Sequence, residues 1–258
     1  MRNSLLALLL VIFAASSAHA ATVLVTGSNR GLGYEFARQY AEAGWTVIAT
    51  ARKLDGAKEL KDLAVAHKNV TLEVLDLMDE PGINLLANKY KGKPIDLVIC
   101  NAGVLGDLPG QTLGGFSYEN FKDVMGANVY GNLAVAQAFR EHVMASRMKK
   151  IVAISSGAGI ISGKGAGGNI YFYRASKVAL NMSMKGLAND LRDKGVIVGI
   201  LSPGAADTGM RRDLVGADRA AKDLKPADSV TSMIKVIAGL TQENTDKPLN
   251  YDGSVMPW

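Results

Sequence analysis

The chain has 258 residues, 48% hydrophobic and 21% charged, which is the composition of a globular protein with one large core or two small ones. Its formal net charge is +5, and no block of lysine and arginine with interleaved aromatic residues predicts a nucleic-acid-binding surface. A single cysteine, Cys100, excludes an internal disulfide framework, and the three histidines lack the spacing of metal ligands. No repeat or proline-rich linker divides the chain, so we expect one domain and no metal site.

The first twenty residues have the pattern of a secretory signal peptide. Arg2 provides a positive start, residues 5–15 form a short apolar core, and Ala18-His19-Ala20 matches a small-x-small cleavage site. The apolar stretch is short for a membrane-spanning helix. We therefore expect Sec-type export to the periplasm or secretory pathway, removal of residues 1–20, and a mature domain at 21–258 without a stable membrane span. The alternatives are an uncleaved anchor and, if the segment is not a signal, a cytoplasmic protein.

After residue 21, short apolar runs alternate with helical segments. The apolar runs predict strands at residues 22–25, 45–51, 70–75, 95–100, 151–154 and 196–201. Helical periodicity predicts helices at residues 34–43, 121–144 and 173–191. Strands that are apolar throughout and separated by helices indicate a parallel sheet covered on both faces. The predicted fold class is α/β: a doubly wound, Rossmann-like parallel sheet with helices on both faces, in a single domain.

A glycine-rich loop joins the first predicted strand to the first predicted helix. Gly27 suits a tight turn, Gly31 a close backbone approach to a pyrophosphate, and Gly33 close packing of the helix on the strand. The helix N-terminus offers N–H groups and a partial positive charge to an anion. The spacing is G-x-x-x-G-x-G rather than G-x-G-x-x-G, but the strand before and the helix after favour dinucleotide binding over a simple turn.

Basic residues near this loop favour NADP over NAD. An NAD-binding protein would place an acid at the end of the second strand to accept hydrogen bonds from the ribose 2′-hydroxyl. This chain has the run 50–53, Thr-Ala-Arg-Lys, at that place. Arg30, inside the glycine loop, and Arg52 can form charge-assisted hydrogen bonds with a 2′-phosphate, unless both face solvent. We expect NADP as the cofactor, with NAD less favoured.

Tyr173 and Lys177 stand four residues apart in a predicted helix, so the phenol and the ammonium share one face. A phenol ordinarily titrates near pH ~10. A cation about 4 Å away, at an effective dielectric of about 20, favours the phenolate by roughly 4 kcal/mol and lowers its pKa by up to roughly 3 units. Such a tyrosine can exchange protons near neutral pH. The spacing alone is common, because a tyrosine and a lysine one turn apart usually mark the edge of a core.

Together these motifs resemble the short-chain dehydrogenase/reductase family, in its short single-domain branch, over about residues 22–258. The matching pieces are the loop 26–33, Asp76-Leu77, Asn101-Ala102-Gly103, Asn128, Ser155-Ser156, Tyr173-x-x-x-Lys177 and Pro203-Gly204 with Thr208. Residues 250–253, Asn-Tyr-Asp-Gly, and the terminal Pro257-Trp258 are most similar to C-factor-like and carbonyl-reductase-like members. The resemblance implies an enzyme that transfers a hydride between a nicotinamide cofactor and a small carbonyl or alcohol substrate.

The resemblance also implies roles for the matching residues and a homo-oligomer. Tyr173 would be the general acid/base, and Lys177 would lower its pKa and hold the nicotinamide ribose. Ser156 would bind the substrate oxygen, and Asn128 would hold a water in the proton relay. With the glycine loop and the two arginines, the predicted cofactor residues are Gly27, Ser28, Arg30, Gly31, Leu32, Gly33, Arg52, Asp76, Leu77, Asn101, Ala102, Gly103, Tyr173, Lys177, Pro203 and Thr208.

Two features depart from the family pattern. A glycine-rich run at 157–168 lengthens the gap between the serine pair and Tyr173, so Ser155 is an alternative acting serine; Tyr171 is close by but has Ala175, not lysine, four residues on. The predicted signal peptide would take the protein away from cytoplasmic NADPH. The alternative function is therefore an exported interaction or signalling protein that keeps the fold with little turnover.

A stretch at residues 205–226 is predicted to fold over the site as a lid. It contains Met210-Arg211-Arg212 and Leu214-Val215. The two arginines would either meet an anionic substrate or lie on a solvated lid surface.

Overall fold

The computed structural model describes residues 20–162, 169–245 and 247–258. The predicted signal peptide falls almost wholly on residues 1–19 and so lies outside the described residues. Within the described ranges, no helix combines the length and apolar character needed to cross a membrane.

One parallel sheet forms the centre of the molecule, with the strand order β3-β2-β1-β4-β5-β6-β7. The strands are β1 (Thr22–Val25), β2 (Thr46–Ala51), β3 (Val70–Val74), β4 (Leu97–Cys100), β5 (Lys150–Ile154), β6 (Ile197–Ser202) and β7 (Leu249–Asn250). The order reverses between β1 and β4, which is the switch point where ligands bind in doubly wound sheets. The predicted α/β fold is confirmed. The sequence pattern does not predict β7, because two residues are too few for a strand pattern.

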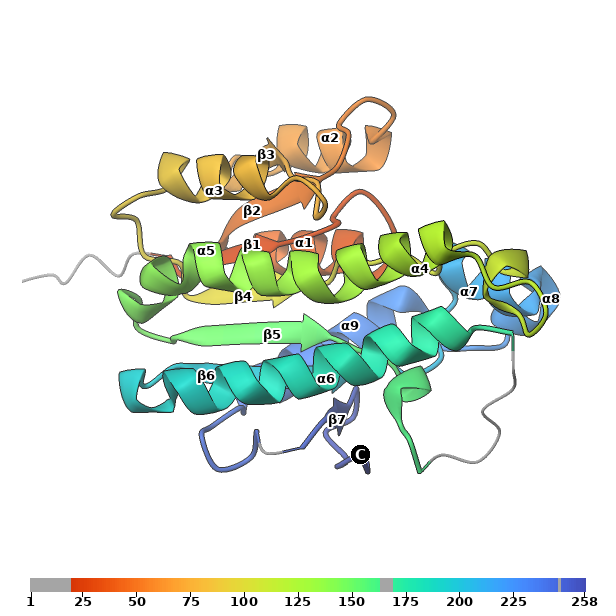
Figure 1. Cartoon of the computed structure of the whole chain (residues 1–258). Coiled ribbons are helices and arrows are strands. Elements are labelled where there is room, and N and C mark those ends of the chain that lie inside the picture. Colours follow the sequence, from red (N-terminus) through yellow and green to blue (C-terminus); the bar gives the residue numbers. More distant parts are fainter. Residues whose placement is uncertain (1–19, 163–168, 246) are drawn as a thin grey trace, which may run out of the picture.

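Helices cover both faces of the sheet (Figure 1). On one face lie α3 (Glu80–Lys89), α4 (Tyr118–Met125), α5 (Asn132–Met144) and α6 (Tyr171–Leu191). On the other lie α1 (Gly31–Glu42), α2 (Lys58–Ala66) and α9 (Pro226–Ala238), and beyond the strand ends lie α7 (Gly209–Val215) and α8 (Ala217–Ala220). Alternate residues of β1 serve the two cores, since Val23 and Val25 pack toward α1 and α9 while Leu24 packs toward α5 and α6.

The helical stretch predicted over 121–144 is confirmed, but its centre is π-helical rather than α-helical. A π-helical segment, η2 (Gly126–Gly131), separates α4 from α5. A Cβ on Gly131 would lie 2.5 Å from the Leu77 carbonyl oxygen, so the chain passes too close to the loop after β3 for a larger residue. Short π segments inside helices occur often at functional sites.

The part of the chain that the structure describes also contains single turns of 3₁₀ helix: η1 (Pro109–Gln111), η3 (Gly157–Gly159) and η4 (Arg192–Lys194). The first two follow β4 and β5 directly in the chain. They therefore lie at the same edge of the sheet as the glycine loop, where the carboxyl ends of the parallel strands meet.

Candidate active site

A cleft of about 1260 Å³ lies at the carboxyl ends of the strands, on both sides of the switch point. Most small-molecule sites measure roughly 300–1000 Å³. The cleft is therefore large enough for a dinucleotide together with a second small molecule.

Nearly all the predicted site residues line this cleft. They are Gly27, Arg30, Gly31, Leu32, Gly33, Arg52, Asp76, Leu77, Asn101, Ala102, Gly103, Ser156, Tyr173, Lys177, Pro203 and Thr208. Two others, Ser28 and Asn128, are fully buried and do not line it. The Ser28 hydroxyl donates to the Val25 carbonyl oxygen at 2.9 Å, and the Ser28 backbone N–H donates to the Thr50 carbonyl oxygen at 2.7 Å. Contrary to the prediction, Ser28 thus braces the glycine loop from beneath.

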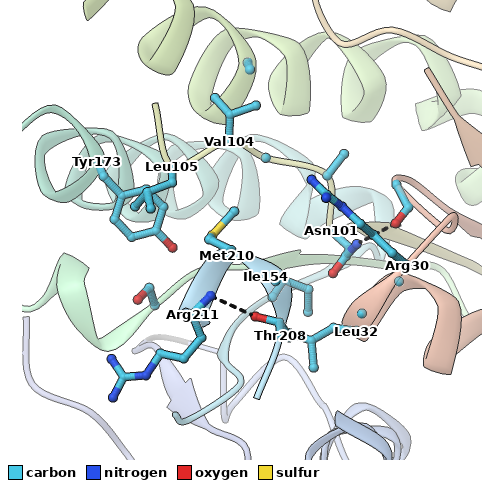
Figure 2. Close-up of a pocket in the computed structure, with 18 of the residues that line it drawn as sticks. Arg30, Leu32, Asn101, Val104, Leu105, Ile154, Tyr173, Thr208, Met210 and Arg211 are labelled. Atoms are coloured by element: carbon cyan, nitrogen blue, oxygen red, sulfur yellow. Dashed lines mark hydrogen bonds between the residues drawn. The ribbon is translucent and has the colours of Figure 1, made fainter. Parts of the chain in front are cut away.

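The glycine loop has the conformation that its three glycines predict. Gly27 and Gly31 have φ angles of 69° and 56°, in the left-handed region that favours glycine. A Cβ on Gly33 would lie 2.1 Å from the Gly27 carbonyl oxygen, so only glycine lets α1 pack this closely on the loop. The Asn101 side chain donates to the carbonyl oxygens of Thr26 and Gly27 at 2.9 and 3.3 Å, and so ties the loop to the end of β4 (Figure 2).

The N-terminus of α1 opens into the cleft without a side-chain cap. Arg30 precedes the helix, no side chain caps the first turn, and that turn contains no acid. Its N–H groups and the helix dipole therefore favour an anion at this place. Arg30, Arg52 and Lys53 line the same end of the cleft, where Asp55 and Asp76 also lie. Cationic side chains beside a free helix N-terminus are the arrangement that a phosphorylated ligand requires.

The predicted lid is present as α7 and α8, and its arginines form ion pairs. Thr208 caps α7, its hydroxyl accepting from the Arg211 N–H at 3.3 Å. The Arg211 guanidinium points away from Tyr173 (Figure 2) and pairs with Asp223 at 2.7 Å. Arg212 pairs with Asp207 at 2.7 Å, which lowers the pKa of that carboxyl. These partners favour an anchoring role for the arginines over recognition of an anionic substrate.

Tyr173 and Lys177 lie on the buried face of α6 and point into the cleft. The Lys177 ammonium is 5.6 Å from the centre of the Tyr173 ring and donates to the Ile154 carbonyl oxygen at 3.0 Å. Burial lowers the pKa of Lys177 to about 8. Burial also raises the pKa of Tyr173, against the opposite effect of a hydrogen bond with Ser156. The expected lowering of the Tyr173 pKa is therefore not found here, because desolvation outweighs a cation farther away than the spacing suggests.

Of the two adjacent serines, Ser156 is the one beside the Tyr173 phenol. The Ser155 hydroxyl is buried and donates to the Asn181 side-chain oxygen at 2.5 Å. Ser156 is half-buried and its hydroxyl accepts from the Ala158 N–H at 3.1 Å, at the start of η3. Ser156 thus shares a hydrogen bond with the Tyr173 phenol in the cleft, whereas the Ser155 hydroxyl is engaged in the core.

Asn128, in the π-helical segment, uses its side chain on the backbone of the loop after β4. Its Oδ1 accepts from the Val104 N–H at 2.8 Å, and its Nδ2 donates to the Val104 carbonyl oxygen at 2.9 Å and to the Ser176 hydroxyl at 3.0 Å. Both amide hydrogens of Asn128 are used, so this side chain could hold a water only through the second lone pair of its Oδ1. The geometry therefore shows Asn128 holding the cleft wall.

The end of the cleft beyond Tyr173 is apolar. Leu105, Ile170 and Tyr173 form a small buried cluster, against which Leu108, Ala158, Met210 and Leu214 pack. Met210 and Leu214 come from the predicted lid at residues 205–226, and Leu105 and Leu108 from the loop after β4. An apolar group therefore fits next to the Tyr173 hydroxyl.

Comparisons with known proteins agree with this geometry. The model of the short chain dehydrogenase family matches residues 21–218. The chain belongs to the short-chain dehydrogenase family. This chain is 31% identical over 250 residues to an uncharacterised oxidoreductase of Schizosaccharomyces pombe, and the match covers 91% of this chain and 96% of the relative. The NADPH-bound carbonyl reductase from chicken fatty liver superimposes with a TM-score of 0.84 and 30% identity, covering 93% of this chain and 100% of the other.

A third relative is named as a signal rather than as an oxidoreductase. Over 165 residues the dehydrogenase is 33% identical to the C-signal of Myxococcus xanthus, covering 64% of this chain and 93% of the relative. The predicted family is confirmed, and the protein is an oxidoreductase of the short-chain dehydrogenase/reductase type.

Several residues around the cleft of this dehydrogenase carry no sequence signal. Val104, Asn120 and Met256 line it, the last from the C-terminal segment. Gln111 is buried behind it and, together with Asn120, holds the loop after β4. Their positions depend on contacts between segments far apart in the chain, which a single-sequence pattern does not contain.

Proposed function

We propose that this enzyme reduces carbonyl compounds with NADPH, with Tyr173 as the proton donor. The observation that carries the proposal is the meeting of the Tyr173 phenol, the Ser156 hydroxyl and the Lys177 ammonium at the junction of two parts of one cleft. One part is the glycine loop with its basic residues, and the other is the apolar end.

The chain's own residues fit a dinucleotide phosphate. The glycine loop and the uncapped N-terminus of α1 form a cradle for a pyrophosphate. Gly27 turns the loop with a positive φ, and the absence of a Cβ on Gly33 lets the helix start close to it. Arg30 and Arg52 would bind a 2′-phosphate, and Lys177 and Thr208 would hold the nicotinamide end. A bound nicotinamide cofactor supplies the hydride.

The proton chemistry follows from the three polar side chains. Tyr173, kept protonated by its raised pKa, donates its hydroxyl proton to the substrate oxygen as negative charge develops there. Ser156 donates a hydrogen bond to the same oxygen. Lys177, with a pKa of about 8, is mostly charged at neutral pH and stabilises the phenolate that remains. In the reverse direction Tyr173 accepts the proton of an alcohol.

The apolar end of the cleft favours a neutral, hydrophobic carbonyl substrate. Apart from Tyr173, its side chains are aliphatic or sulfur-containing, and Arg211, which follows Met210 on α7, is paired with Asp223. Burial of aliphatic surface stabilises such a complex by about 25 cal/mol per Å² before the costs of binding.

Replacing Tyr173 by phenylalanine tests the mechanism, and Tyr171→Phe is the matched control. Both tyrosines belong to α6, but Tyr171 is 43% exposed and packs edge-to-face against Phe116. With NADPH and an aliphatic aldehyde, we expect Tyr173→Phe to lower kcat by about 10²–10⁴-fold without weakening NADPH binding. Tyr171→Phe should leave kcat unchanged. Undiminished turnover in the Tyr173 variant would overturn the mechanism.

Serine substitutions at Arg30 and Arg52 test the choice of cofactor. Loss of a charge-assisted contact to the 2′-phosphate should weaken NADPH binding by about tenfold for each arginine and leave NADH binding unchanged. Equal weakening of both cofactors would show that the arginines support the loop rather than recognise the phosphate.

A second proposal is an exported signalling protein that turns over little substrate. It is supported by the signal-peptide pattern of residues 1–20 and by the similarity to the C-signal. A cofactor-binding enzyme should be stabilised by roughly 2.7 kcal/mol at a cofactor concentration 100-fold above Kd. The absence of stabilisation by NADPH and NADH would favour this second proposal, and N-terminal sequencing of the native protein would test cleavage after Ala20.

A further inference from the structure

Gln111 is a fully buried glutamine that joins the loop after β4 to the first turn of α6. Its Nε2 donates to the carbonyl oxygens of Leu105 and Asp107 at 2.8 and 3.2 Å. Its Oε1 accepts from the Tyr173 N–H at 3.0 Å. These partners determine the orientation of the amide, because the carbonyls can only accept and the N–H can only donate.

The contact with Tyr173 replaces a cap that α6 lacks. The first N–H groups of a helix have no partner within the helix, and the residue before α6, Ile170, has no side chain that can cap them. Gln111 provides a partner from a distant part of the chain, and it does so at Tyr173 itself. The carbonyl oxygen of Tyr173 accepts from the Ser176 hydroxyl at 2.7 Å, so its backbone is held on both sides.

The other end of the Gln111 amide holds the wall of the apolar cleft. Leu105 belongs to the cluster around Tyr173. The Asp107 carbonyl oxygen also accepts from the Asn120 side chain at 2.7 Å, and Asn128 holds Val104 in the same loop. Among these three buried amides, Gln111 alone contacts both the loop and Tyr173 directly.

We propose that Gln111 is a positioning residue that sets the Tyr173 phenol against the loop lining the substrate end of the cleft. The inference rests on the proposed function, since it assigns Tyr173 the proton transfer. Displacing a reacting group by about 1 Å can lower the rate by about 10²-fold. Loss of the Gln111 amide should therefore change kcat more than the binding of NADPH, because most of the predicted cofactor residues, other than Tyr173 and Lys177, belong to the glycine loop and to the loops after β2, β3 and β4.

Two substitutions of Gln111 separate positioning from simple stability. Gln111→Met keeps the length of the side chain and removes all three hydrogen bonds. A protonated Gln111→Glu carboxyl still accepts from the Tyr173 N–H and can donate its one O–H to the Leu105 or the Asp107 carbonyl oxygen. An ionised carboxylate would face both carbonyl oxygens with no proton to donate. Burial and the nearby Asp107 carboxylate raise the pKa of the introduced acid. Gln137→Met, on the exposed side of α5, is the matched control.

In NADPH-dependent reduction of an aliphatic aldehyde, well below the melting temperature, we expect Gln111→Met to lower kcat by about 10–100-fold. The Kd for NADPH should change by less than about threefold. The Gln111→Glu variant should approach wild-type kcat at low pH and lose it as pH rises, which a merely structural role would not produce. Wild-type kcat in folded Gln111→Met, or a wild-type pH profile in Gln111→Glu, would overturn the proposal.

Amide hydrogen exchange separates failure of this inference from failure of the proposed function. If the wild-type protein reduces no carbonyl, the proposed function is wrong, and exchange still measures the contact. Faster exchange at the first turn of α6 in Gln111→Met, with the rest of α6 unchanged and Gln137→Met like wild type, would support positioning of Tyr173 by Gln111. Unchanged protection at that turn would refute it.

Discussion

Replacing Gly33 by alanine tests whether α1 packs too closely on the glycine loop for any side chain. The new Cβ would lie 2.1 Å from the Gly27 carbonyl oxygen, about 0.9 Å inside the 3.0 Å below which such contacts are essentially absent. Gly27 cannot easily recede, because Asn101 binds its carbonyl oxygen and Ser28 ties the loop to β2. The start of α1 must therefore move.

The matched control is Gly186→Ala in α6, where a Cβ would have no atom within 4 Å. Alanine in a helix stabilises by about 0.5–1 kcal/mol relative to glycine, so this variant should have a raised free energy of unfolding. At Gly33 the same gain is opposed by overpacking, which typically costs about 1–3 kcal/mol. Each kcal/mol corresponds to about 2–4 °C in Tm for a domain of this size.

Thermal melts with and without NADPH measure both the stability of each variant and its stabilisation by the cofactor. We expect Gly33→Ala to melt lower than wild type, to bind NADPH more than about tenfold more weakly, and to lose most of the stabilisation by cofactor. Gly186→Ala should melt higher and bind NADPH like wild type. If both variants shift Tm in the same direction and bind NADPH equally, the close packing of α1 on the loop is not what requires glycine.

Three buried ionisable groups carry further predictions. Reduction needs Tyr173 and Lys177 protonated, so kcat/KM should fall by about tenfold per pH unit above the Lys177 pKa of about 8, and a flat profile would contradict this. The same lowered pKa makes the free energy of unfolding rise between pH about 8 and 10.5, because the unfolded chain still holds the proton that the folded protein has released; Lys177→Met should lack this rise. Lys150→Met should lower the free energy of unfolding by about 1–3 kcal/mol, since its buried ammonium donates to two carbonyl oxygens at the end of α9 at 2.7 and 3.0 Å, whereas exposed Lys235→Met should stay within about 0.5 kcal/mol. Burial raises the pKa of the Cys100 thiol to about 12, so iodoacetamide near pH ~8 should label it only after unfolding, and labelling of the native protein would refute its burial.

Local patterns predict most of the fold because they record burial directly. A strand covered on both faces is apolar at successive positions, and β1, β2, β4, β5 and β6 all show this in the sequence. The π-helical segment at residues 126–131 has no such local pattern. It depends on the close approach of Gly131 to the loop after β3, a contact between segments more than 50 residues apart in the chain.

The candidate site divides in the same way. The glycine loop, the Tyr173–Lys177 pair and the basic residues near β2 can be predicted from the chain alone, because motif spacing and helical period place them at one edge of a parallel sheet. Contacts between distant segments place Ser156 rather than Ser155 beside Tyr173, turn Ser28 into the core, and bring Gln111 to the first turn of α6. The physical reason is that a short polar side chain has the same local sequence context whether it faces a cleft or the core, and its direction depends on the partners that distant segments bring to it.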